Sequence, residues 1–126
     1  MKASTVISIA AVIASVVLAG QAQAQSLNDI LATLTGHMAQ VGAEQKATQA
    51  ANAAGDPASA CRHIAAAAAN ADAASQDLDT MQATLDANTT MSDAVRADWQ
   101  GHITDARGSV NTLSSSNHAL FDRYCS

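Results

Sequence analysis

Residues 53–58 read Ala-Ala-Gly-Asp-Pro-Ala, and this stretch decides how the chain is divided. Glycine readily adopts the left-handed conformation in which many helices end, so Gly55 predicts the end of a preceding helix. Asp56 is a favoured N-cap residue, and Pro57 suits the first helical position because its missing N–H would have no partner there. One helix therefore ends and the next begins here, with a connection short enough to place the two helices antiparallel.

The sequence on both sides of this junction is periodic. Helices are predicted from Ser26 to about Asn52, from Pro57 to about Ala87, and from Thr90 or Ser92 toward the C-terminus. Apolar side chains recur every three or four residues, and no stretch has the period of two that marks a strand. The three stripes are Leu27, Ile30, Leu31, Leu34, Met38 and Val41; then Cys61, Ile64, Ala68, Ala71, Ser75, Leu78, Met81 and Leu85; then Met91, Val95, Trp99, Ile103, Ala106, Val110, Leu113, Leu120, Phe121 and Tyr124.

The predicted fold class is all-α, an up-down-up antiparallel three-helix bundle, because a second short connection at Asn88-Thr89-Thr90 joins the last two segments. The serine run 114–116 weakens the last segment, so a second form of the prediction adds a short fourth C-terminal helix. Trp99 lies on the apolar stripe and is expected in the core. Asn88 begins a glycosylation sequon in a turn expected to be exposed, which only a eukaryotic secretory pathway would use.

The N-terminal residues have the features of a signal peptide. Lys2 precedes an apolar run from Val6 to Leu18, which is too short for a transmembrane helix, and Ala22-Gln23-Ala24 matches a signal-peptidase site. Gln21 stands where a lipoprotein would need cysteine, so lipid anchoring is disfavoured. We therefore expect residues 1–24 to be a cleaved signal peptide and residues 25–126 to form one alanine-rich domain, located in the periplasm or secreted.

Two cysteines, Cys61 and Cys125, are expected to form one disulfide, which is the ordinary use of an even cysteine count in a small exported domain. In an antiparallel pair of helices these two positions meet at one end. No large apolar residue occurs between Val41 and Cys61 or between Ile64 and Leu78. The disulfide is therefore expected to link the part of the bundle with the weakest core.

Charge and motifs exclude several classes of function. The net charge of −5 provides no basic surface for nucleic acid or anionic lipid, and stable membrane insertion after signal cleavage is not expected. No Gly-x-Ser-x-Gly elbow, phosphate-binding glycine loop or Cys-x-x-Cys-His motif occurs in the sequence. We predict that the protein is not an enzyme and has no catalytic residues or resident cofactor.

The histidines are the residues that best suit a ligand site. His37 and His102 are predicted to lie at one height in the bundle together with Asp77, where two imidazoles and a carboxylate would suit a divalent metal. His37 or Met38 together with His102 would suit a haem between helices. Solvated or hydrogen-bonded histidines are the favoured interpretation. His63 and His118 form a second level pair, which predicts an acid-sensitive disulfide end.

These observations favour a small exported, non-enzymatic helical protein that acts through its surface as a binding or envelope-associated interaction protein. The expected surface is alanine-rich, residues 43–54 and 58–74, where short side chains would accept a partner helix or a second copy. The alternative is a metal- or haem-binding bundle that uses His37, Met38 and His102.

Overall fold

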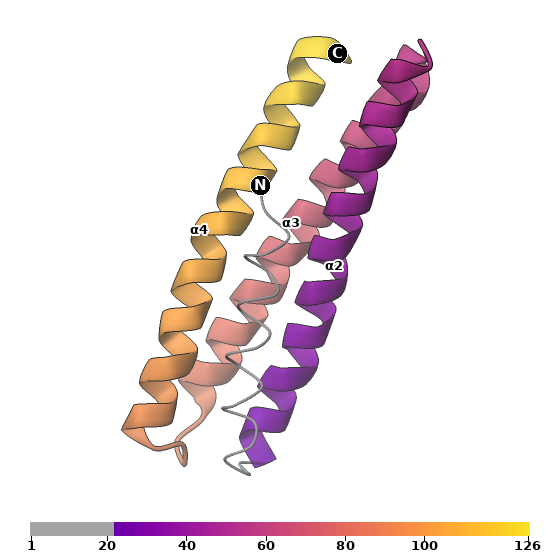
Figure 1. Ribbon diagram of the computed structural model, residues 1–126. Helices are drawn as coiled ribbons and strands as arrows, with labels where there is room; N and C mark the ends of the chain where they lie inside the picture. Colours follow the sequence, from indigo (N-terminus) through magenta and orange to yellow (C-terminus); the bar gives the residue numbers. More distant parts are fainter. Residues whose placement is uncertain (1–21) are drawn as a thin grey trace.

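A computed structural model describes residues 22–126, which are helical almost throughout. Helix α2 spans Ala22–Ala53, α3 spans Pro57–Ala87 and α4 spans Asp93–Tyr124 (Figure 1). The described residues contain no strand, so the all-α prediction is confirmed. Most of the predicted signal peptide lies outside the described residues, and its predicted cleavage point after Ala24 falls in the first turn of α2.

The junction between α2 and α3 has the predicted geometry. Gly55 has a φ of +72°, in the left-handed region, and Pro57 is the first residue of α3. The Asp56 carboxylate accepts a hydrogen bond from the Ser59 backbone N–H at 3.0 Å, which satisfies one of the N–H groups that the first turn leaves without a helical partner. Local sequence alone therefore determines where these two helices meet.

Asn88 organises the junction between α3 and α4. Its side-chain oxygen accepts the backbone N–H groups of Thr90 and Met91 at 3.0 and 2.9 Å. Arg96 of α4 donates to the backbone carbonyls of Leu85 and Asn88, at the end of α3 where carbonyls lack helical partners. The expectation that Asn88 is exposed is wrong, because only 7% of this residue is accessible to solvent.

Helix α3 lies between α2 and α4 and packs against both (Figure 1). Within the described residues, close backbone contacts join α2 to α3 and α3 to α4, and none joins α2 to α4. One apolar core draws on all three helices, and Trp99 is fully buried in it as predicted. On α3 the small side chains of Ala67, Ala71 and Ala74 are part of this core, where they allow close approach of the neighbouring helix backbones.

The predicted break at residues 114–116 does not occur, because α4 is continuous to Tyr124 and no fourth helix follows it among the described residues. Its buried positions continue through the serine run as Val110, Leu113 and Asn117, so tertiary packing outweighs the weak helix propensity of serine. The Cys61–Cys125 disulfide is present, with 5.7 Å between the Cα atoms.

Cys61 and Cys125 are separated from the junction of α3 and α4 by unequal stretches of helix, and the difference is accommodated at the end of the bundle opposite the disulfide. Arg107 of α4 contacts Asp79 of α3. Helix α3 ends eight residues after Asp79, whereas α4 begins fourteen residues before Arg107. At 1.5 Å per residue, α4 extends about 9 Å further than α3 at this end. Among the described residues, no helix combines the length and hydropathy that crossing a bilayer requires.

Candidate functional site

Three of the four histidines contact a carboxylate on a neighbouring helix. His37 of α2 contacts Asp77 of α3, His63 of α3 contacts Glu44 of α2, and His118 of α4 contacts Asp72 of α3. Helix α3 therefore takes part in every one of these contacts. We call these three pairs the histidine–carboxylate contacts.

The predicted metal site is only partly assembled. His37 Nδ1 lies 2.6 Å from Asp77 Oδ2, so these two residues are level, as the sequence suggested. His102 has no hydrogen-bond or ion-pair partner in residues 22–126, and the backbone of α2 makes no close contact with α4, which carries it. Arg107, five residues further along α4, contacts Asp79. Because α4 begins beyond the end of α3, His102 lies nearer that end of α3 than Asp77 does.

Metal ligands do not cluster elsewhere in the described chain. Residues 22–126 contain no group of three or more His, Cys, Asp or Glu side chains placed to hold one metal ion. Met38, the other candidate haem ligand, is buried in the apolar core. His37 and Asp77 thus form a pair without a third ligand from these residue types.

Glu44 is held on both of its carboxylate oxygens. His63 Nδ1 lies 2.7 Å from Oε1, and the Gln40 side-chain amide donates to Oε2 at 3.1 Å. The hydrogen bond from His63, reinforced by that from Gln40, keeps the pKa of Glu44 below its ordinary value. A carboxylate can only accept, so the imidazole nitrogen that faces it carries the proton.

Asp72 has the same arrangement on the other side of α3. Ser114 Oγ donates to Oδ1 at 2.7 Å, and His118 Nε2 lies 2.9 Å from Oδ2. The hydrogen bond from Ser114 is the main reason that the pKa of Asp72 is lowered, and the contact with His118 adds to it against the opposing effect of partial burial. His63 and His118 therefore do not form a pair with each other; each faces a carboxylate.

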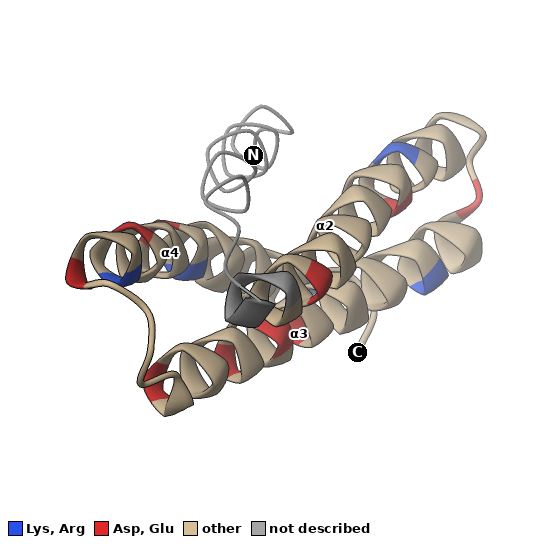
Figure 2. Cartoon of the chain, turned by 90° about the horizontal axis from the view of Figure 1, so that it is seen from below, with Lys and Arg blue, Asp and Glu red and all other residues tan. Residues whose placement is uncertain are grey.

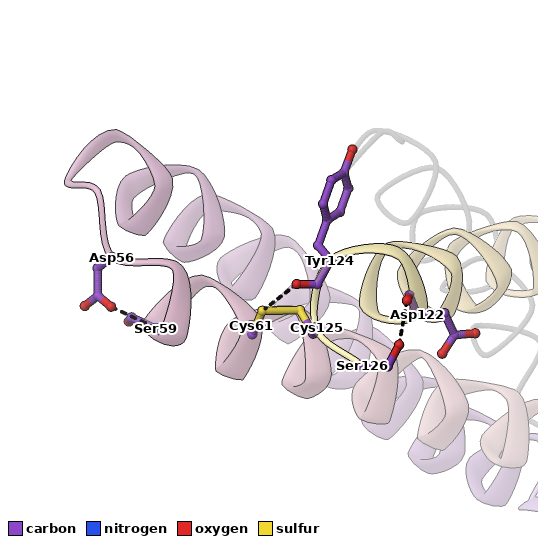
Figure 3. Close-up of a disulfide and its surroundings, with 7 residues drawn as sticks. All are labelled: Asp56, Ser59, Cys61, Asp122, Tyr124, Cys125 and Ser126. Carbon is purple, nitrogen blue, oxygen red and sulfur yellow. Dashed lines mark hydrogen bonds between the residues drawn. A yellow bond between two sulfur atoms is a disulfide. The ribbon is translucent and has the colours of Figure 1, made fainter.

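The disulfide end exposes large apolar side chains. Leu120 and Tyr124, one turn apart on α4, are 41% and 65% exposed, and they are the exposed large hydrophobic residues of the described chain. In Figure 3 the Tyr124 ring points away from the Cys61–Cys125 bond and from α3. The Arg123 guanidinium carbon lies 5.9 Å from the centre of this ring, within cation–π range. We call Leu120, Arg123 and Tyr124 the disulfide-end surface.

Charges are sparse and unevenly distributed. Acidic residues outnumber lysine and arginine on each helix (Figure 2). Lys46, Arg62 and Arg123 lie toward the disulfide end and form no ion pair within residues 22–126. Arg96 and Arg107, toward the other end, bind backbone carbonyls and Asp79. Of these cations, Arg123 is part of the disulfide-end surface.

The predicted alanine surface is only partly at the surface. Near the junction of α2 and α3, the exposed alanines are Ala43, Ala50, Ala53, Ala54 and Ala58. In contrast, α3 buries Ala60, Ala67, Ala68, Ala71 and Ala74. The stretch 58–74 is therefore chiefly an internal packing surface. A run of identical small residues carries no polarity, so its sequence cannot show which side of the helix faces inward.

Comparison of the chain with protein-family models, with curated proteins and with solved structures found no match.

Proposed function

We propose that this is a small exported, non-enzymatic helical protein that acts through its surface as a binding or envelope-associated interaction protein. The observation that carries the proposal is the disulfide-end surface, where Leu120 and Tyr124 are exposed next to Arg123. Aromatic and arginine side chains supply much of the binding energy at protein interfaces. A protein partner or a second copy of the chain is the expected ligand, and neither nucleic acid nor membrane is expected.

The proposed setting is the periplasm or the extracellular medium. The disulfide supports this location, because such bonds persist in oxidising compartments and are rare in the cytosol. The proposed topology is the up-down-up three-helix bundle. The order of side-chain contacts supports it, since His37 and Glu44 of α2 meet Asp77 and His63 of α3 in reversed order.

The test compares two variants in cells that export the protein. Leu120→Ser with Tyr124→Ser removes the apolar part of the disulfide-end surface, and Asn111→Ser with Thr112→Ser changes exposed polar residues of the same helix. Crosslinking in intact cells, followed by sedimentation of the purified protein, should show an adduct or dimer that only the first variant loses. A monomer without adducts, or an adduct that survives in the first variant, would contradict the proposal.

The alternative function, a metal- or haem-binding bundle that uses His37, Met38 and His102, has one observation in its favour. Histidines that bind metals commonly donate their other ring N–H to a carboxylate, and the contact between His37 Nδ1 and Asp77 leaves Nε2 available. Elemental analysis and a visible spectrum of untagged protein from its exporting host decide this alternative. A colourless, metal-free sample would eliminate it.

A further inference from the structure

Two of the histidine–carboxylate contacts lie on opposite sides of α3, in the half of the bundle that has the smallest core side chains. Glu44 and His63 join α2 to α3, and Asp72 and His118 join α3 to α4. Between Ile64 and Leu78, α3 buries only alanines. Alanine buries little apolar surface, so polar contacts carry a larger share of the stability here than in a core of leucine.

Both carboxylates are held in place before any histidine is charged. Gln40 occupies the second oxygen of Glu44, and Ser114 occupies the second oxygen of Asp72. The imidazole nitrogens that face the carboxylates already donate, so each histidine takes up a further proton at its other ring nitrogen without losing the existing contact. The side chains of His63 and His118 are 35% and 53% exposed, which gives solvent access for that proton.

Protonation at this second nitrogen converts a neutral hydrogen bond into an ion pair. Hydrogen bonds between an imidazolium and a carboxylate are shorter and stronger than those with a neutral donor. Histidine ordinarily acquires this charge between about pH 7 and pH 5, where aspartate and glutamate are still ionised. A protonated imidazole in either contact therefore faces an ionised carboxylate and forms an ion pair with it.

The other charges around these histidines do not reverse this effect. Arg62 precedes His63, but adjacent helical positions do not face each other, and Arg62 is exposed. Lys46 is separated from Glu44 by one residue on α2 and lies on a different face for the same reason. Asp122, one turn beyond His118 on α4, adds a second carboxylate on its side. The only charged partner of His118 in residues 22–126 is Asp72 of α3, and no charged residue of α2 contacts it.

We propose that His63 and His118 with their carboxylates form an acid-strengthened clamp, which ties α3 to both neighbouring helices most firmly near pH 5. The sequence predicted an acid-sensitive disulfide end from two histidines at one level. In the structure each of these histidines faces a carboxylate, so protonation adds an attraction on each side of α3. The clamp keeps the alanine-rich half of the bundle and the nearby disulfide end ordered in mildly acidic surroundings.

The test is thermal unfolding of the exported, disulfide-bonded protein from pH 7.5 to pH 5. The clamp predicts that Tm rises on acidification by about 5 °C, from two partly exposed ion pairs. The His63→Gln/His118→Gln variant should lose most of this rise. The matched control, His102→Gln, removes a histidine without an ion partner in the described chain and should keep it. The same series in 0.5 M salt screens long-range repulsion between like charges. A difference in the Tm rise between the unaltered protein and the double variant that remains in salt is therefore due to the clamp and not to a general change in net charge.

Amide hydrogen exchange of the unaltered protein gives a second readout that needs no variant. Protection factors across residues 60–72 should increase from pH 7.5 to pH 5 more than those across residues 78–87. A Tm that is flat or falling over this range would overturn the proposal. It would also be overturned if His102→Gln lost as much of the rise as the double variant, or if exchange slowed equally in both segments.

Discussion

Replacing the disulfide by Cys61→Ala with Cys125→Ala should be the most damaging change at the surface of this protein. The bond closes a loop between cysteines 64 positions apart, for which the chain-entropy model gives a stabilisation of about 4 kcal/mol. Both cysteines are only half-buried, so their removal leaves no large cavity. Because domains of this size have a total stability of about 5–15 kcal/mol, the loss should lower Tm by roughly 20 °C.

The structure also predicts where this loss appears first. Asn117 is the last buried residue of α4, and Leu120 and Tyr124 beyond it are exposed. Beyond the contact of His118 with Asp72, the disulfide therefore attaches the end of α4 to α3. In the double variant, amide exchange should accelerate across residues 118–124 before the rest of the bundle is affected.

Urea unfolding followed by circular dichroism measures the free-energy difference between the oxidised protein and the double variant. Equal m-values in the two proteins would show that the denatured states are comparable. Single cysteine variants are unsuitable controls because a free thiol can form intermolecular disulfides. A loss below about 1 kcal/mol, or unchanged exchange in residues 118–124, would refute the reasoning that loop closure and the end of α4 depend on this bond.

Three further predictions concern local structure, and urea unfolding tests each of them. Gly55→Ala should cost about 1–2 kcal/mol because its φ is +72°, whereas Gly42→Ala, in the middle of α2 with open space around it, should stabilise by about 0.5–1 kcal/mol. Asn88→Ala should cost about 1–3 kcal/mol because the backbone N–H groups of Thr90 and Met91 lose their acceptor. The control Thr89→Ala, at an exposed position of the same turn, should be nearly neutral. The pKa of Asp72 is lower in the folded state than in the unfolded chain, so its contribution is present above the ordinary aspartate value of about 4 and is lost as the pH falls through the lowered pKa. Ser114→Ala, which removes the main cause of that shift, should therefore reduce stability at pH 6 and leave it nearly unchanged at pH 2.5.

The helices and their junctions could be predicted from local chemistry. Gly55, Asp56 and Pro57 act through backbone conformation and hydrogen bonds within a few residues, so tertiary context adds little to them. The disulfide followed from the cysteine count and from the proximity of helix ends. The carboxylate partners of the histidines could not be predicted in this way. Helical rise along each segment placed His37 level with Asp77, which is what the structure shows. It placed His102 at the same level, because the extension of α4 beyond the end of α3 cannot be read from local sequence.

The sequence by itself determined that this chain forms long helices, where the connections between them fall, and that one disulfide joins α3 to the end of α4. Only the tertiary structure decided which alanines of α3 face inward, that Asn88 is buried, and that each of three histidines lies against a carboxylate. The physical reason is the separation along the chain over which each interaction acts. Capping and helix propensity act between residues a few positions apart, whereas the rotation and register of one helix against another depend on side chains distant in sequence, and an alanine run specifies neither.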